Sequence, residues 1–318
     1  MKTKKWLYIA TFLTISGLLL CTLAVMLGFD IRKPNKSSEY VTKTNVINEG
    51  FRNIEIDADT EKISFVLSSD NVCKVVFREK KDRPHQTLVR NDTLLIKEGE
   101  NDLNSWSMNL SGEEMSITVY LPKTQYDVLK IDSDTGDITI PEGFIFEEID
   151  IDVDTAVVDL KSSSRNDISI TTDTGAILIS NVSCSDMELE SDTGRMELTY
   201  ITTQGDLTIK EDTGKVVLDN VKCNDLDISS DTGSITLNYV LASEDMTLGS
   251  DTGSVELNDV DARNIKIETT TGKVNGVLLS AKQFVTKTST GKVDVPDSNK
   301  GGKCEIVTNT GSITIRIR

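Results

Sequence analysis

The feature that most constrains this chain is a glycine that recurs every 19 or 20 residues through its C-terminal half. The glycine usually ends the tripeptide Asp-Thr-Gly, and alanine replaces it once. Apolar and polar residues alternate on both sides of it, which is typical of a strand with one buried face, and no repeat has the periodicity of a helix. The ten positions are Gly136, Ala156, Gly175, Gly194, Gly214, Gly233, Gly253, Gly272, Gly291 and Gly311.

A unit of this size cannot bury an apolar face alone, but coils stacked with like columns over like columns form one continuous core. The sequence therefore predicts an all-β fold, a single-chain parallel β-solenoid of about ten coils over residues 129–318. Coils of parallel strands lie about 4.8 Å apart, so the predicted molecule is a narrow rod.

An open solenoid end exposes unpaired backbone and core, so a cap is expected at the N-terminal side. Residues 45–128 contain strand-like segments joined by polar loops, and we predict an irregular β-rich cap there. The segment "IDADTEK" in this cap looks like an altered copy of the motif, with Glu61 in place of glycine. At the other end, Arg316 and Arg318 are expected to blunt the edge of the last strand.

The first residues of the chain predict a membrane anchor. Between Lys5 and Asp30 no residue is charged, and about 20 apolar residues are enough to span a bilayer. We predict a cytoplasmic tail over residues 1–5, one transmembrane helix over 6–29 and a linker over 30–44. The short tail favours a single-pass protein of the cell membrane with an extracytoplasmic solenoid, although cleavage of the segment and a cytoplasmic solenoid both stay open.

The motif aspartates have two interpretations. Stacked one per coil, they would form a row of like charges that needs compensation. Each carboxylate could accept backbone N–H groups of its own turn, or the row could bind calcium through its oxygens. We favour turn capping, because the last three coils carry Thr270, Ser289 and Asn309 at this position and so need no charge. The calcium candidates are Asp134, Asp154, Asp173, Asp192, Asp212, Asp231 and Asp251.

The motif threonine is present in all ten repeats, which suggests a structural role. Counting the alternation forward from the apolar positions seven and five residues before the glycine places this threonine on the inward side. We therefore predict an internal threonine ladder that satisfies backbone groups at the corner, with aspartate outside. The predicted structural turns comprise Thr135, Gly136, Thr174, Gly175, Thr193, Gly194, Thr213, Gly214, Thr232, Gly233, Thr252 and Gly253.

The residues offer little for catalysis. An aspartic protease uses Asp-Thr-Gly twice, but its two carboxylates share a proton in a cleft, whereas equivalent aspartates along a ridge make no unique pair. The single histidine, His85, lies in a segment expected to be a solvated loop, so no Ser-His-Asp triad or zinc cluster is predicted. Cys184, Cys223 and Cys304 fall in core columns and are expected to be small buried side chains. No cofactor is expected.

Charge is distributed unevenly. The net charge is −17, but residues 1–36 hold six Lys/Arg and one Asp, and residues 262–318 hold ten Lys/Arg and four Asp/Glu, which leaves −28 for residues 37–261. An acidic body argues against nucleic-acid binding. The basic C-terminal tip could contact an anionic envelope polymer, or an acidic or membrane protein partner, through Lys273, Lys292, Lys303, Arg316 and Arg318.

The N-terminal anchor, the stretch "SITVYLPK" before "LKIDSDTGDITI" and the serial coils resemble a bacterial family of β-strand-repeat proteins described as putative adhesins. The resemblance covers about residues 45–318 and implies no catalytic residues. The anchor, the acidic solenoid and the basic tip favour a non-enzymatic, membrane-anchored surface solenoid, adhesin-like or an interaction module of the cell envelope. Two alternatives remain, an envelope-stress regulator acting through a membrane partner and a polysaccharide-cleaving β-helix enzyme, although such enzymes use long loops where this chain has short connections.

Overall fold

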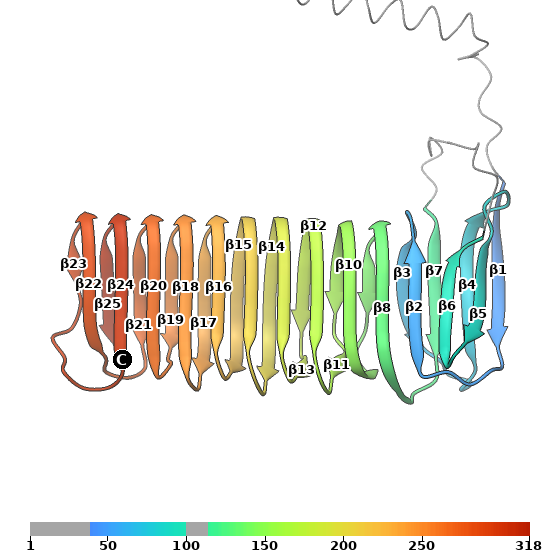
Figure 1. The fold of residues 1–318 in the computed structure, drawn as a ribbon, viewed down its shortest axis with the longest axis horizontal. Helices are drawn as coiled ribbons and strands as arrows, with labels where there is room; N and C mark the ends of the chain where they lie inside the picture. Colours follow the sequence, from blue (N-terminus) through green and yellow to red (C-terminus); the bar gives the residue numbers. More distant parts are fainter. Residues whose placement is uncertain (1–38, 100–113) are drawn as a thin grey trace, which may run out of the picture.

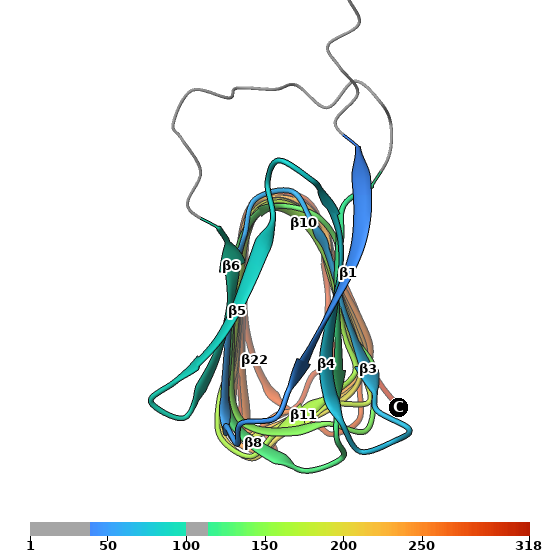
Figure 2. The same ribbon diagram turned by 90° about the vertical axis from the view of Figure 1, so that its right-hand side faces the viewer.

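The structure is a computed structural model that describes residues 39–99 and 114–318. Within these residues all regular structure is β, and the strands join into one sheet that coils around a narrow core. Figure 1 shows the resulting rod, and Figure 2 looks along its axis. The predicted β-solenoid is confirmed. No helix in the described part of the chain is long and apolar enough to cross a membrane, and the predicted anchor over residues 6–29 lies outside that part.

Each motif coil has two long sides and a short third side. The first long side rises to the motif, the chain bends there, and the second long side returns (Figures 1 and 2). Like residues pair with like residues of the next coil, for example Gly175 with Gly194. The strands are β8 (Gln125–Thr135), β9 (Ile138–Ile140), β10 (Ile145–Leu160), β11 (Ser163–Ser164), β12 (Ile168–Ser180), β13 (Ser183–Cys184), β14 (Met187–Thr203), β15 (Leu207–Cys223), β16 (Leu226–Thr232), β17 (Ile235–Ala242), β18 (Asp245–Thr252), β19 (Val255–Val260), β20 (Asn264–Thr271) and β21 (Val274–Leu278).

The core is one continuous column of aliphatic side chains along the rod. Each coil contributes inward residues from all three sides; Ile209, Leu218 and Val221 in β15 are each fully buried. The aromatic rings Phe65 and Phe77 instead lie in the core at the N-terminal end. The described cysteines Cys73, Cys184, Cys223 and Cys304 are all unpaired and buried, which confirms the core positions predicted for the last three.

The cap at the N-terminal end consists of one coil and further strands added on its outer side. β2 and β3 form a coil that stacks on β8 and β9, and Glu61 lies over Gly136, so the altered motif copy is confirmed. β6 and β7 pair in parallel with the outer side of that coil, and β4, β5 and β1 then add antiparallel strands. The strands are β1 (Tyr40–Ile47), β2 (Asn53–Ala58), β3 (Lys62–Leu67), β4 (Cys73–Lys80), β5 (His85–Arg90), β6 (Thr93–Glu98) and β7 (Ser116–Leu121).

The last two coils are stacked in the reverse of their chain order. β24 (Lys303–Thr310) lies between β20 and β22 (Gln283–Thr290), and β25 (Ile313–Ile317) lies between β21 and β23 (Val293–Asp294). The coil that ends the chain therefore lies between the coil of β20 and β21 and the coil of β22 and β23 (Figure 1). Arg316 and Arg318 therefore do not lie on the outermost coil, as expected from the sequence, because β22 and β23 stack outside the coil that carries them. Within β25, however, only Ile313 and Thr314 pair with β23, so the end that carries the arginines has a strand partner on one side only.

The glycine column permits this stacking. A Cβ atom built on Gly233 would lie 1.5 Å from the carbonyl oxygen of Gly214, and one on Gly253 would lie 1.6 Å from that of Gly233. Real Cβ atoms do not approach backbone oxygen so closely, so a side chain here would force adjacent coils apart. The recurring glycine therefore reflects close backbone approach from coil to coil.

Candidate functional site

The motif aspartates form a row on the outside of the bend. Asp134, Asp154, Asp173, Asp192, Asp212, Asp231 and Asp251 are all exposed, one per coil. Among the described residues the one hydrogen bond to these carboxylates comes from Thr270 Oγ1 to Asp251 Oδ1, at 3.5 Å. No backbone N–H of the motif donates to them, so the turn capping favoured from the sequence is not formed.

The physical reason is that backbone N–H groups at the bend already donate to the neighbouring coil. The glycine N–H donates to the threonine carbonyl of the next coil, as in Gly233 N to Thr252 O at 2.9 Å and Gly253 N to Thr271 O at 3.0 Å. The ladder between coils therefore uses the donors that a capping aspartate would need.

Near the N-terminal end of the row, Asp134 lies among other carboxylates. Burial, followed by the charges of neighbouring carboxylates such as Asp59 and Asp132, raises the pKa of Asp134, and the pKa of Asp152 is raised in the same way. No group of three or more Asp, Glu, His or Cys side chains in residues 39–99 and 114–318 is arranged to hold a metal ion. Calcium binding along the row, the alternative that the sequence did not favour, stays untested.

The inward hydroxyl ladder exists, but the motif threonine does not form it. Thr174, Thr193 and the other motif threonines are exposed, so the predicted internal threonine ladder is wrong. The alternation breaks because the side chains of two successive residues at the bend, the motif aspartate and the motif threonine, both point outward. The buried polar position is two residues before the threonine, at Ser133, Thr172, Ser191, Glu211, Ser230, Ser250, Thr269 and Thr308.

Only some of these hydroxyls bond to the backbone as the threonines were expected to, because the hydroxyls of Ser133, Ser191, Ser230 and Thr269 have no hydrogen-bond partner among the described residues. Thr308 Oγ1 donates to the Gly272 carbonyl at 3.2 Å, and Thr288 Oγ1 donates to the Gly311 carbonyl at 3.0 Å. The position was recognisable in the sequence, because most repeats carry a Ser or Thr three residues before the glycine. Only the geometry of the bend shows which of the two polar columns points inward.

Glu211 is the one carboxylate in this inward column. It is 2% exposed, and its Oε1 accepts the Gly194 N–H at 3.1 Å, whereas Oε2 has no hydrogen-bond partner among the described residues. Burial raises the pKa of Glu211 to about 7, and the Gly194 hydrogen bond only partly opposes that shift. A group of this kind can hold a proton near neutral pH, but its neighbours in the column are the hydroxyls of Ser191 and Ser230, and neither is a base.

His85 is buried and not solvated, contrary to the expectation for its loop. It is 2% exposed, stacks on Phe77 with 5.1 Å between ring centroids, and places Nδ1 3.0 Å from Glu79 Oε2 and Nε2 3.5 Å from Glu61 Oε1. Burial alone would lower the pKa of His85, but the hydrogen bonds and charges of Glu61 and Glu79 outweigh it and raise that pKa. The ion pair joins β4 and β5 to the first coil, which indicates a structural role for the cap.

The predicted tip residues come together on the last three stacked coils, but most are neutralised. Arg318 Nη1 lies 2.8 Å from Asp259 Oδ2, Arg316 pairs with Asp294, and Lys303 pairs with Glu305. Lys273 and Lys292 are exposed and take part in no ion pair among the described residues, and the same holds for Lys287 on β22. Lys300 in the same coils is likewise exposed and unpaired among the described residues, so four free ammonium groups define the positive end.

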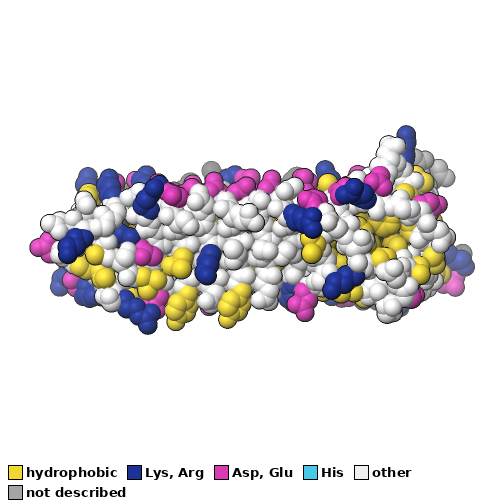
Figure 3. Space-filling view, turned by 90° about the horizontal axis from the view of Figure 1, so that it is seen from below, with side chains coloured by type: hydrophobic (Ala, Val, Ile, Leu, Met, Phe, Trp, Pro, Cys, Tyr) yellow, Lys and Arg dark blue, Asp and Glu magenta, His cyan; other side chains and the backbone are white. Residues whose placement is uncertain are grey.

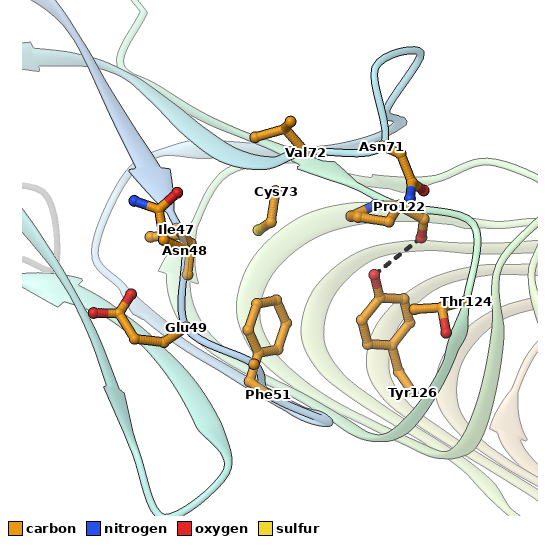
Figure 4. A pocket seen from close by; sticks show the side chains of 11 residues that line it. Ile47, Asn48, Glu49, Phe51, Asn71, Val72, Cys73, Pro122, Thr124 and Tyr126 are labelled. Atoms are coloured by element: carbon orange, nitrogen blue, oxygen red, sulfur yellow. Dashed lines mark hydrogen bonds between the residues drawn. The ribbon is translucent and has the colours of Figure 1, made fainter.

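Two of the hollows on the described surface are lined in part by carboxylates, and neither contains a histidine. One of about 340 Å³ is at the N-terminal end, where Phe51 and Tyr126 stack at 6.0 Å and Cys73 lines the wall (Figure 4). Burial raises the pKa of Cys73 to about 12, so its thiol stays protonated and is a poor nucleophile. The other, of about 370 Å³, contains Asp231 and Asp251 but no histidine, cysteine or lysine.

A family model described as Toastrack DUF4097 matches residues 51–211 and again residues 202–318. The chain belongs to this family. The two matches meet where β14 passes into β15, and there the ladder and the core of the Toastrack solenoid continue without a break. The two matches therefore mark repetition within one rod and not two separate domains.

Solved structures from bacteria are similar to this Toastrack chain. A putative adhesin from Bacteroides fragilis NCTC 9343 is 14% identical, with 88% of this chain and 98% of that chain covered at a TM-score of 0.42. A putative adhesin from Parabacteroides distasonis ATCC 8503 is 11% identical, with 87% and 97% covered at 0.45. A putative lipid binding protein from the same organism is 12% identical, with 86% and 96% covered at 0.34. No curated protein matches the sequence.

Proposed function

We propose that the protein is a non-enzymatic binding rod of the cell envelope, adhesin-like in action and anchored in the cell membrane by its N-terminal segment. The observation that carries the proposal is the charge reversal along one uninterrupted solenoid. The shaft exposes a row of carboxylates, and the far end exposes ammonium groups that no acidic side chain in the described region neutralises. Such a rod repels anionic polymers along its length and attracts them at its end.

The connections between coils support a binding role over a catalytic one. Most motif coils pass from one strand to the next in a few residues, and in β14 and β15 one strand runs through the bend. Enzyme sites on such scaffolds are built from long loops around a groove. The described hollows contain carboxylates or a protonated thiol without the partners that general acid–base or nucleophilic catalysis requires.

Charge reversal at three of the free tip lysines tests the proposal. The full-length variant Lys273→Glu/Lys287→Glu/Lys292→Glu is compared with the wild type for binding to isolated cell envelopes at low and physiological salt. We expect strongly reduced and less salt-dependent binding. The matched control reverses Lys97, Lys123 and Lys222, which lie away from the tip, and retains binding. Equal binding by the tip variant and the wild type would show that the tip is not the contact surface.

The anchor and its orientation are tested separately. Protease added to intact cells is expected to degrade the rod and to leave a cytoplasmic marker protein intact. A rod that survives until the cells are permeabilised places the solenoid inside and overturns the surface role. Crosslinking of the rod to a membrane protein, with none to envelope polymer, would instead favour the regulatory alternative.

A further inference from the structure

The corner between the second and third sides has a special backbone conformation in five successive coils. The residue six positions after the motif glycine has a left-handed φ there: 59° at Asn181, 56° at Tyr200, 55° at Asn220, 54° at Tyr239 and 55° at Asp259. Asn and Asp are the side chains that tolerate this region best after glycine, whereas a bulky side chain there is strained. The two tyrosines are thus held where the fold itself prefers asparagine.

Both tyrosines are also unusually exposed. Tyr200 is 59% exposed and Tyr239 is 55% exposed, more than any other large hydrophobic side chain in the described residues. Neither ring takes part in an aromatic or cation–π contact within the described chain. Figure 3, which looks at the face built by the third sides, shows hydrophobic side chains projecting along one long edge of this face. The rings therefore contribute nothing visible to folding, and strain of this kind is typical of functional positions.

The spacing of the two rings follows from the register. Asp219 pairs with Thr199 on one side and with Asn238 on the other, so Tyr200, Asn220 and Tyr239 occupy the same position in three adjacent coils. The two tyrosines are two coils apart, about 10 Å along the rod axis. Polar groups surround them: Asn220 between the rings, Asp219 and Asn238 beside them.

We propose that this tyrosine ridge, Tyr200 with Tyr239, binds a β-1,4-linked glycan chain lying parallel to the rod. Each sugar of such a chain is turned over relative to the last, so the same ring face recurs every second sugar, a repeat close to the separation of the tyrosines. An aromatic ring packs against the apolar face of a sugar, and its phenol hydroxyl stays available to water or a sugar hydroxyl. Asp219, Asn220 and Asn238 supply hydrogen-bond acceptors and donors for the hydroxyls of the intervening sugar.

A protein partner fits these observations less well. The two rings are separated by the polar Asn220, whereas stable protein interfaces need a broad surface with a desolvated centre. A glycan needs only separated platforms in the correct repeat. The ridge lies on the shaft, away from the free tip lysines, so this inference is independent of the electrostatic contact proposed above.

Calorimetric titration of the full-length protein, in a detergent without a sugar headgroup, tests the inference. The probes are the β-1,4-linked hexamers of glucose and of N-acetylglucosamine, with the α-1,4-linked glucose hexamer as the ligand control. The wild type is expected to bind at least one β-1,4 hexamer and to bind the α-1,4 hexamer at least tenfold more weakly. Absence of binding to both β-1,4 hexamers, or equal affinity for the α-1,4 hexamer, would overturn the proposal.

Variants separate a binding role from a structural one. Tyr200→Asn and Tyr239→Asn are each expected to weaken binding at least tenfold, and the double variant to abolish it. Because asparagine suits the left-handed corner, the melting temperature of these variants is expected to stay the same or to rise. Leu88→Asn, which removes an exposed apolar side chain from β5, is the matched control and retains binding. Unchanged affinity in the double variant, or a fall in its melting temperature, would assign the tyrosines no binding role. The tip charge-reversal variant is expected to bind the hexamer as the wild type does.

Discussion

Replacing Glu211 with glutamine isolates the cost of a single buried carboxylate in the solenoid core. The other coils place serine or threonine at this inward position, except for Val153. Glutamine has the shape of a protonated glutamic acid and keeps an oxygen that can accept the Gly194 N–H, which Glu211 Oε1 accepts at 3.1 Å. The stability of the variant therefore differs from that of the wild type mainly at pH values at which the Glu211 carboxyl group is ionised.

The magnitude follows from the pKa. In the unfolded chain the Glu211 carboxyl group titrates near 4.5, whereas in the folded protein burial raises its pKa to about 7. Each pH unit of that difference corresponds to about 1.4 kcal/mol, so the ionised carboxylate costs the folded state about 3 kcal/mol. Below pH 4.5 the group is protonated in both states and costs nothing. Between pH 4.5 and about 7 the folded state binds more protons than the unfolded state, so the free energy of unfolding falls as pH rises.

The assay is urea unfolding of wild type and Glu211→Gln at a series of pH values and constant salt, followed by circular dichroism. The stability of the variant relative to the wild type is expected to rise by about 3 kcal/mol from about pH 4 to pH 8. The control Glu190→Gln, on an exposed position of the neighbouring coil, should show no comparable change. A difference between Glu211→Gln and wild type that is the same at every pH would refute the reasoning.

Three further predictions follow from the same structure. Gly233→Ala is expected to destabilise the rod by about 4 kcal/mol or more, because the new Cβ would lie 1.5 Å from a backbone oxygen, whereas Gly249→Ala, whose Cβ would have no neighbour nearer than 3.8 Å, should be close to neutral in thermal unfolding. His85→Gln removes the cation between two buried carboxylates and should cost about 3–5 kcal/mol near pH 6. Because the folded-state pKa of His85 is raised above 6.5, this deficit should shrink as pH rises through that pKa, and a deficit independent of pH in urea unfolding would contradict the ion pair. Calcium or a chelator should leave the melting temperature unchanged, and a calcium-dependent rise in scanning calorimetry would restore the aspartate row as a metal site.

Much of the candidate surface could be predicted from the sequence, because strand alternation is local. The exposure of Asp231 and Tyr239 and the burial of Cys223 follow from counting residues within one coil. Counting failed at the bend, where two successive residues point outward and the inward hydroxyl moves from the threonine to the position of Ser230. Alternation assumes an extended strand, and the tight curvature at the motif violates that assumption.

What the sequence determined by itself is the coil: its length, its apolar columns and the glycine that lets backbones approach. Each of these depends on contacts between residues that repeat at a fixed spacing. Only the tertiary structure decided the order in which the last coils stack, because every coil presents the same ladder and the same column to its neighbours. It also decided that His85, from a polar stretch of the chain, is buried between Glu61 and Glu79, since that contact joins residues with no repeat relation. Finally, it showed that Tyr200 and Tyr239 share the left-handed φ of their column, which Asn181, Asn220 and Asp259 indicate by residue type but a tyrosine does not.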